Sequence, residues 1–316
     1  MHLDKKIGVL MGGASAERDI SLQTGAAVAT ALRAKGYEVV ELDLNETTAH
    51  ELISEKVQIV YNALHGKWGE DGCVQGMLEI MRVPYTGSGV MSSAVGMDKV
   101  VSKTLFQMAG LPVPAYEFVS RKARLLGNVS PPDFGFPIVV KPATEGSSVG
   151  IAIVGDAMEF DAALEEAFEY DDRVLLEQYV AGREMSVAVL ADRALGIVEI
   201  RPKPVEGKRF TFYDYEHKYT KGMTEYITHP EGLTDEVHGR MRELAVLATQ
   251  TLQGEGVVRV DFILDHEQQP WLLEVNTLPG LTELSLVPMI AHDWAGMEFG
   301  DLVQLVLSTA RLKVGS

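Results

Sequence analysis

Two β-like runs near the end of the chain carry two carboxylates and an amide at positions that can face each other. The runs flank a polar turn, Asp265–Pro270, which is typical of a β-hairpin. Symmetric pairing about that turn puts Asp261 opposite Glu274. It likewise puts Arg259 opposite Asn276, and strand alternation places all four on one face. Facing carboxylates about 5 Å apart repel each other unless a cation lies between them. Oxygen ligands suit magnesium, so the pattern predicts a metal site; a solvated sheet face is the alternative.

A lysine followed by a Gly/Ser turn forms a second feature. Lys141 ends a predicted strand, and the turn Thr144–Ser148 leads into the next one. Backbone N–H groups of such a turn can hold phosphate oxygens, to which Lys141 adds a positive charge. The order differs from a Walker A motif, in which the lysine follows the glycines. An ordinary hairpin loop is the structural alternative.

Aromatic, acidic and basic residues are mixed in the segment Phe210–Tyr219, between Gly207 and Gly222. A loop with this many reactive and hydrogen-bonding side chains is typical of an active-site lid. A surface loop with partly buried aromatic residues is the alternative interpretation.

Two polar segments follow strands in the first third of the chain, Gly12–Leu22 and His65–Gly72. Sheets of the α/β class bind ligands where their strands end. Taken alone, Glu17 is more typical of a carboxylate at a helix start, and His65 of a structural histidine.

The elements that must position these residues alternate between strands and helices at first, which predicts a parallel three-layer α/β domain. Its expected strands are Ile7–Met11, Tyr37–Leu42 and Val57–Tyr61, and its helices are Ser21–Lys35 and Val74–Met81.

The middle of the chain differs, because the pattern there is typical of a small α+β domain. We expect a loop-rich segment, Phe118–Gly135, then the strands Pro137–Lys141, Val149–Val154 and Val174–Gln178 around the helix Asp156–Tyr170. For the last part we expect the strands Met185–Leu190 and Leu195–Ile200, the helix Thr234–Gln253, the hairpin and the helix Phe299–Leu312.

The bulk composition narrows the class of protein. A chain of 316 residues is long enough for two or three domains. Its net charge of −17 argues against a general binder of nucleic acid or membrane surfaces. Cys73 is the single cysteine, so no internal disulfide can form, and no apolar stretch is long enough to span a bilayer. We therefore expect a cytoplasmic protein.

Eight motifs, in this order, resemble those of the D-alanine–D-alanine ligases of the ATP-grasp superfamily. The likeness covers essentially the whole chain, and one such match alone would carry little weight. The motifs are Gly12–Ser21, His65–Gly72, Met97–Lys99, Lys141–Gly150, Tyr213–Tyr219, Arg259–Asp261, Glu274–Gly280 and Ser285–Pro288.

The resemblance implies an α/β and α+β fold with three domains in the ATP-grasp architecture. The first, residues 1–97, is a Rossmann-like substrate domain with a parallel sheet. Residues 98–183 form a small central α+β domain. Residues 184–316 carry the metal site and the lid. A homodimer is also expected from the family.

The resemblance further implies which residues bind ATP and metal. Three lysines hold the ATP phosphates: Lys99, Lys141 and Lys218. The segment that receives adenine and ribose contains Glu177, Tyr179, Val180 and Glu184, while the side chains that pack on the purine are Phe212 and Leu273. Two magnesium ions, for which manganese can substitute, bind to Asp261, Glu274 and Asn276.

The resemblance assigns the remaining site residues to the two D-alanine substrates. Glu17 pairs with the ammonium group of the first D-alanine, near His65. Ser147 and Tyr219 bond to Glu17 and close the lid, and a tyrosine at position 219 favours an amine as the second nucleophile.

The implied reaction is ATP-dependent formation of D-alanyl-D-alanine through an acyl phosphate, for peptidoglycan synthesis. Arg259 and the Gly280 amide hold the oxyanion, and Ser285 and the Leu286 amide bind the second carboxylate.

Two other enzyme classes compete with this interpretation. One is an ATP-grasp ligase with a different amino acid or peptide substrate. The other is a nicotinamide-dependent oxidoreductase, which Gly87-Ser88-Gly89 suggests weakly because Ser92 stands where the third glycine of that fingerprint belongs. A non-catalytic nucleotide-binding regulator ranks last.

Overall fold

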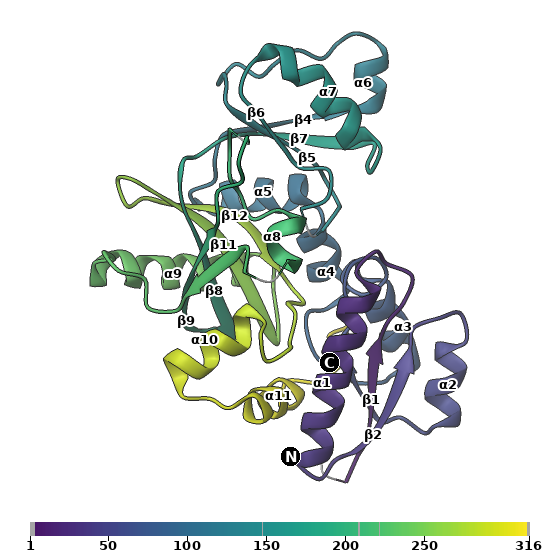
Figure 1. The fold of residues 1–316 in the computed structure, drawn as a ribbon. Coiled ribbons are helices and arrows are strands. Elements are labelled where there is room, and N and C mark those ends of the chain that lie inside the picture. The colour runs from purple at the N-terminus through teal and green to yellow at the C-terminus, as the bar shows by residue number, and fades with distance from the viewer. Residues whose placement is uncertain (1–3, 147, 208, 221, 315–316) are drawn as a thin grey trace.

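The structure is a computed structural model that describes residues 4–146, 148–207, 209–220 and 222–314 (Figure 1). The strands of this part of the chain form three sheets, of three, five and four strands. No helix among these residues is long and apolar enough to cross a membrane.

The first sheet is parallel, as the sequence predicted, with the strand order β2-β1-β3. One of its faces packs against α1, and the other packs against α2 and α3. Helix α2 was not predicted. The elements of this part are β1 (Lys6–Met11), α1 (Arg18–Ala34), β2 (Glu38–Asp43), α2 (Thr48–Ser54), β3 (Ile59–Asn62) and α3 (Cys73–Met81).

The four-stranded sheet is antiparallel, with the order β4-β7-β5-β6, and α7 covers one of its faces. Figure 1 shows it at the opposite end of the molecule from the first sheet. Its elements are β4 (Tyr116–Ser120), α6 (Arg121–Leu125), β5 (Ile138–Pro142), β6 (Ala152–Val154), α7 (Ala157–Phe168) and β7 (Arg173–Gln178).

Two predictions for this sheet were wrong in part. The segment Phe118–Gly135 is not loop throughout, because it contains the end of β4 and all of α6. Since β4 is an edge strand that leaves Phe118 exposed, it lacks the apolar alternation of an inner strand. The strand predicted from Val149 begins only at Ala152, because Gly150 has a φ of +67°, outside the β region.

The five-stranded sheet is antiparallel, with the order β10-β9-β8-β11-β12. Helix α9 covers one face of this sheet. Helices α10 and α11 cover the other face, together with α1 from the part of the chain that forms the first sheet, which we call the first unit. Its elements are β8 (Gly182–Leu190), β9 (Arg193–Pro202), α8 (Tyr215–Tyr219), β10 (Thr224–Ile227), α9 (Asp235–Thr251), β11 (Val257–Asp265), β12 (Pro270–Asn276), α10 (Leu286–Ala295) and α11 (Phe299–Ser308).

Helices α4 (Val90–Met97) and α5 (Lys99–Met108), like α10, were not predicted. Asp98 caps the start of α5, since its side chain accepts hydrogen bonds from two backbone N–H groups of the first turn. Its buried face carries Lys103 as well as apolar residues, so the apolar stripe that marks a packed helix is interrupted.

The last helix is shorter than predicted. It ends at Ser308 instead of Leu312, and Arg311 then forms an antiparallel bridge with Tyr85 beside β3. The predicted domain boundaries, at 97/98 and 183/184, stay predictions.

Candidate active site

The β11–β12 hairpin has the register that the sequence predicted. Asp261 pairs with Glu274, and Arg259 pairs with Asn276. These four side chains line cavities, whereas the residues that alternate with them are buried in the core beneath α9. The polar face of the hairpin is therefore the face that is open to a ligand.

A β-bulge changes the register just beyond this quartet. Phe262 pairs with Leu272, so Leu273 is an extra residue on β12 that unbroken pairing about the turn does not account for. As a consequence Leu273 and Glu274, although consecutive, both line the same cavity. The bulge thus brings an apolar side chain next to the carboxylate.

Cations surround the two hairpin carboxylates. The guanidinium of Arg259 donates to Asp261 at 2.8 and 2.9 Å, and Lys99 Nζ lies 3.7 Å from Glu274 Oε2. Burial raises the pKa of the Glu274 carboxyl, but the charges of Lys99 and neighbouring cations outweigh burial and bring this pKa to about 2. Glu274 is hence available as an ionised oxygen ligand at neutral pH.

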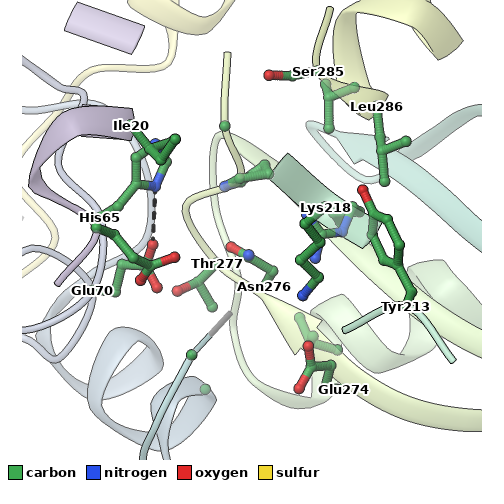
Figure 2. Close-up of a pocket in the computed structure, with 18 of the residues that line it drawn as sticks. Ile20, His65, Glu70, Tyr213, Lys218, Glu274, Asn276, Thr277, Ser285 and Leu286 are labelled. Carbon is green, nitrogen blue, oxygen red and sulfur yellow. Dashed lines mark hydrogen bonds and ion pairs between the residues drawn. The ribbon is translucent and has the colours of Figure 1, made fainter. Parts of the chain in front are cut away.

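Two adjacent cavities contain the predicted residues. The larger, about 440 Å³, lies between the start of α1, the end of β12 and the start of α10. Figure 2 shows His65 and Glu70 on one side of it, and Lys218, Tyr213 and Glu274 on the other. The predicted site residues on its wall are Glu17, His65, Lys99, Lys218, Arg259, Glu274, Asn276, Gly280, Ser285 and Leu286.

Glycines let two separate loops approach Glu17 in the larger cavity. A Cβ atom on Gly66 would lie 2.9 Å from Glu17 Oε2, and one on Gly146 would lie 3.2 Å away. The turn after Lys141 therefore reaches across to the first unit and contacts the carboxylate. Ser147, which follows Gly146, lies outside the described residues.

His65 belongs to a buried polar network that also contains Glu70, which is not among the predicted site residues. Its Nδ1 lies 3.2 Å from Glu70 Oε1, and its Nε2 lies 3.1 Å from Thr24 Oγ1. Burial raises the pKa of Glu70, His65 opposes that shift, and the charge of Glu17 adds to it. Glu70 is part of the His65–Gly72 motif, so the motif itself carried the signal.

The smaller cavity, about 140 Å³, lies between the four-stranded and five-stranded sheets. Its wall combines apolar side chains, such as Ile153 and Ile263, with a few charged groups, a composition typical of a small-molecule site. The predicted residues on this wall are Lys141, Glu177, Tyr179, Val180, Glu184, Phe212, Lys218, Arg259, Asp261, Leu273 and Glu274.

The two cavities share part of their walls. Tyr213, Lys218, Arg259 and Glu274 line both. A ligand that filled the smaller cavity would thus meet a ligand in the larger one at these charged side chains.

The segment predicted as a lid contributes Lys218 to this junction through helix α8. Lys218 Nζ lies 5.2 Å from the centre of the Tyr213 ring, within the range of a cation–π interaction. Burial lowers the pKa of Lys218, and the charge of Glu274 opposes that shift. The side chain of Tyr219 lies outside the described part of the structure.

The sequence did not single out Glu70 and Tyr213, which line the cavities, or Lys103, which lies behind the wall of the smaller one. Tyr213 begins the motif Tyr213–Tyr219, and its hydroxyl lies 2.7 Å from that of Tyr226. Lys103 follows Lys99 by one helical turn, but this spacing has meaning only once α5 is recognised as a helix.

Comparisons with known proteins agree with this arrangement. The family model "D-ala D-ala ligase C-terminus" matches residues 105–308, and "D-ala D-ala ligase N-terminus" matches residues 44–88. A D-alanine--D-alanine ligase of Trichlorobacter lovleyi is 47% identical over 98% of this chain and 96% of its own length. One from Geobacter sulfurreducens is 46% identical over 98% and 95%.

Solved structures show the same similarity. The D-alanine--D-alanine ligase of Bacillus anthracis complexed with ATP superposes with a TM-score of 0.82 at 32% identity, covering 96% of this chain and 97% of that one. VanG D-Ala:D-Ser ligase from Enterococcus faecalis gives 0.81 at 28% identity, covering 96% and 99%. With two family models matched and relatives this similar over nearly the whole length, the chain belongs to the D-alanine–D-alanine ligase family.

Proposed function

We propose that this protein is an ATP-dependent ligase that joins two D-alanine molecules and releases ADP and phosphate. The observation that carries the proposal is the junction between the cavities. A nucleotide in the smaller cavity would direct its terminal phosphate toward Lys218, Arg259 and Glu274, which also line the larger cavity. The near full-length similarity to named ligases supports the same reaction.

The first step activates a carboxylate. A free carboxylate is a poor electrophile, so an oxygen of the first D-alanine attacks the γ-phosphorus of ATP and forms an acyl phosphate, while ADP leaves. Glu17 would pair with the ammonium group of that D-alanine, with His65 nearby. Lys99, Lys141 and Lys218 would offset the negative charge of the phosphates.

Asp261, Glu274 and Asn276 fit a magnesium site. Their donors are all oxygens and lie on one face of paired strands, and Glu274 is ionised at neutral pH. Asn276 would supply the third protein ligand through the oxygen of its side-chain amide. Two magnesium ions, or manganese in their place, would neutralise phosphate charge there.

The second step forms the peptide bond. The amine of the second D-alanine attacks the acyl carbon, and phosphate leaves with the C–O bond electrons and the proton that the nitrogen loses. The backbone N–H of Gly280 and the guanidinium of Arg259 would stabilise the oxyanion. Ser285 and the amide of Leu286, at the start of α10, would bind the carboxylate of the second D-alanine.

The lid segment would exclude water, because water hydrolyses an acyl phosphate. We propose that Ser147 and Tyr219 bond to Glu17 and hold the lid closed, and that Tyr219 favours an amine over a hydroxy acid. We also propose a homodimer that works in the cytoplasm and supplies peptidoglycan synthesis.

One coupled assay tests the proposal. Purified protein, magnesium ATP and D-alanine should give ADP and D-alanyl-D-alanine in equal amounts. D-Lactate, a hydroxy acid, offered together with D-alanine should enter the second position poorly, because Tyr219 favours an amine as the second nucleophile. No ADP release with D-alanine, together with release for another amino acid, would contradict the proposal and favour a different ATP-grasp ligase.

A further inference from the structure

Lys103 is a buried, charged residue that has no role in the proposed reaction. Its side chain is fully buried, at 0% exposure, on helix α5. Its ammonium forms an ion pair with Glu177 and lies 3.4 Å from the carbonyl oxygen of Leu272. Burying a lysine is unfavourable unless its charge is compensated, so these contacts require an explanation.

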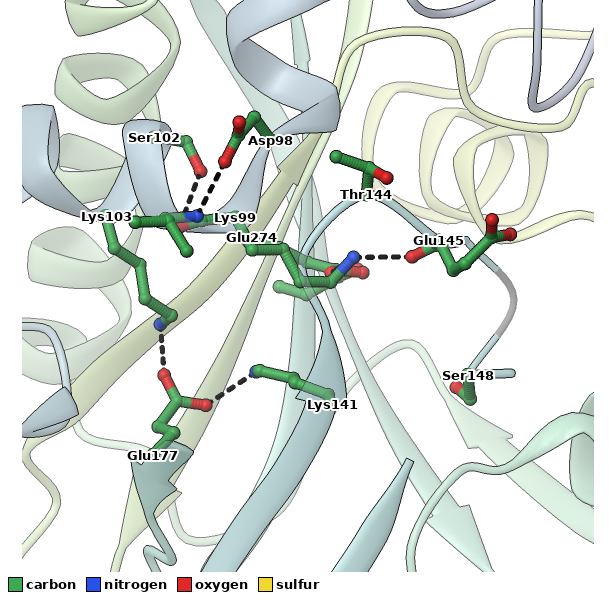
Figure 3. Close-up of polar contacts among 12 residues, drawn as sticks. Asp98, Lys99, Ser102, Lys103, Lys141, Thr144, Glu145, Ser148, Glu177 and Glu274 are labelled. Atoms are coloured by element: carbon green, nitrogen blue, oxygen red, sulfur yellow. Dashed lines mark hydrogen bonds and ion pairs between the residues drawn. The ribbon is translucent and has the colours of Figure 1, made fainter. Parts of the chain in front are cut away.

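Glu177 interacts with two ammonium groups at once. Lys103 binds one carboxylate oxygen, and Lys141 Nζ lies 2.6 Å from the other (Figure 3). Glu177 itself is only 1% exposed. The three buried groups together carry one excess positive charge, and Lys141 is the lysine that lines the smaller cavity.

The two lysines occupy different positions relative to the cavity and therefore have different functions. Glu177 and Lys141 line the cavity, whereas Lys103 lies behind Glu177, away from the lining of either cavity. With Lys103 as its partner, Glu177 is already neutralised. The charge of Lys141 is then left for an anion in the cavity.

Building on the proposed function, we propose that Lys103 is a positioning residue for ATP, because its ammonium neutralises and orients Glu177 and so leaves Lys141 to bind the triphosphate.

The place of Lys103 in the fold supports this role. Through Glu177 on β7 it contacts the four-stranded sheet, and through the Leu272 carbonyl on β12 it contacts the five-stranded sheet. These sheets are the two walls of the smaller cavity. Lys99, one turn earlier on α5, donates to the Glu145 carbonyl at 2.6 Å. One helix therefore holds both walls and the turn that follows Lys141.

A purely structural ion pair is the competing explanation, and it predicts different kinetics. Removing one partner of a buried pair destabilises a protein whatever its ligands. A structural defect would alter the KM values for ATP and D-alanine together. A positioning role alters the KM for ATP alone.

The test compares Lys103→Met with Lys103→Arg and with the exposed control Lys122→Met. We expect Lys103→Met to raise the KM for ATP about tenfold or more, as for the loss of one charge-assisted contact. The KM for D-alanine should stay within twofold, and kcat within threefold. Lys103→Arg should restore most of the ATP affinity, and Lys122→Met should match the wild type. Equal changes in both KM values, or an unchanged KM for ATP, would overturn the proposal.

A second comparison covers the case in which Lys103→Met does not fold. Glu177→Gln removes the carboxylate that Lys103 would position, so adding Lys103→Met to it should change the KM for ATP less than twofold. A further rise of threefold or more contradicts the proposal.

Calorimetry with a non-hydrolysable ATP analogue separates this inference from the proposed function. If the wild type binds the analogue but makes no dipeptide, the proposed function fails and the role of Lys103 is still measured. If the wild type makes dipeptide and Lys103→Met binds the analogue with unchanged affinity, only the role of Lys103 fails.

Discussion

At the scale of single residues, the site is a balance between buried carboxylates and the cations around them. Glu274 and Glu184 line the same cavity, yet their pKa values shift in opposite directions. Burial raises both, but Lys99 and its neighbours reverse the shift at Glu274. At Glu184 the nearby carboxylates, Asp261 first, add to burial and raise the pKa to about 7. Environment, not residue type, thus decides which carboxylate is charged at neutral pH.

The proposed metal role of Glu274 is tested by Glu274→Gln, which keeps the shape of the side chain and removes its charge. We expect turnover to fall by roughly 10³-fold or more, because an amide binds magnesium much more weakly than a carboxylate. Circular dichroism should show an unchanged fold. Glu267→Gln, an exposed position in the turn of the same hairpin, is the matched control and should keep full activity. Retained activity in Glu274→Gln would discredit the metal assignment.

The raised pKa of Glu184 predicts a pH-dependent stability in the absence of nucleotide and metal. Since the folded protein holds this proton more tightly than the unfolded chain, the group contributes stability at low pH. That contribution is lost as pH rises from the ordinary glutamate pKa of 4.5 through about 7. Glu184→Gln cannot ionise, so its free energy of unfolding relative to wild type should rise by about 1–3 kcal/mol between pH 5 and 8. Denaturant unfolding at both pH values checks this, and a pH-independent difference would count against it.

At the scale of elements, the hairpin was predictable because its strands are close in sequence. Pairing across a short turn fixes the register locally, and the alternation of polar and apolar residues fixes the face. The same reasoning found α1 and α9, whose apolar spacing is regular. It missed α5, whose buried face includes a lysine, and α10, whose start carries Ser285 and Leu286. These helices are defined by what they pack against.

At this scale, the bulge at Leu273 leads to a prediction about ATP binding. Leu273→Ala should raise the KM for ATP about three- to tenfold, because an apolar contact to the purine worth about 1 kcal/mol is lost. The melting temperature should change little, since the side chain is only partly buried. Leu125→Ala, at an exposed leucine of α6, is the control. An unchanged KM for ATP in Leu273→Ala would mean that Leu273 does not contact the nucleotide.

At the scale of the whole molecule, one apolar cluster joins parts that are far apart in sequence. Helix α1 of the first unit, helices α10 and α11, and one face of the five-stranded sheet contribute to the same core. Figure 1 shows α1 and α11 next to each other. The larger cavity lies between the first unit, which carries Glu17, and the five-stranded sheet, which carries Arg259. The shared core therefore holds Glu17 in place relative to Arg259.

Leu302, fully buried in α11, tests this connection. Leu302→Ala should lower the free energy of unfolding by about 2–5 kcal/mol, the usual cost of a core cavity. The first and last units should still unfold in one transition, followed by circular dichroism and by tryptophan fluorescence. Leu305→Ala, 41% exposed on the same helix, should cost far less. Two separate transitions would show that the units are energetically independent.

The sequence by itself determined the chemistry that is local to one stretch of chain. Neighbouring residues were enough to predict that Asp261 faces Glu274 and that a lysine precedes a Gly/Ser turn. The order of the motifs could also be read directly from the sequence. Only the tertiary structure decided which stretches meet. Lys103 and Glu177 are 74 positions apart in the chain, and their contact depends on how a helix packs between two sheets. The junction of the cavities at Lys218, Arg259 and Glu274 has the same origin, because long-range packing, not local periodicity, sets the distance between separate elements.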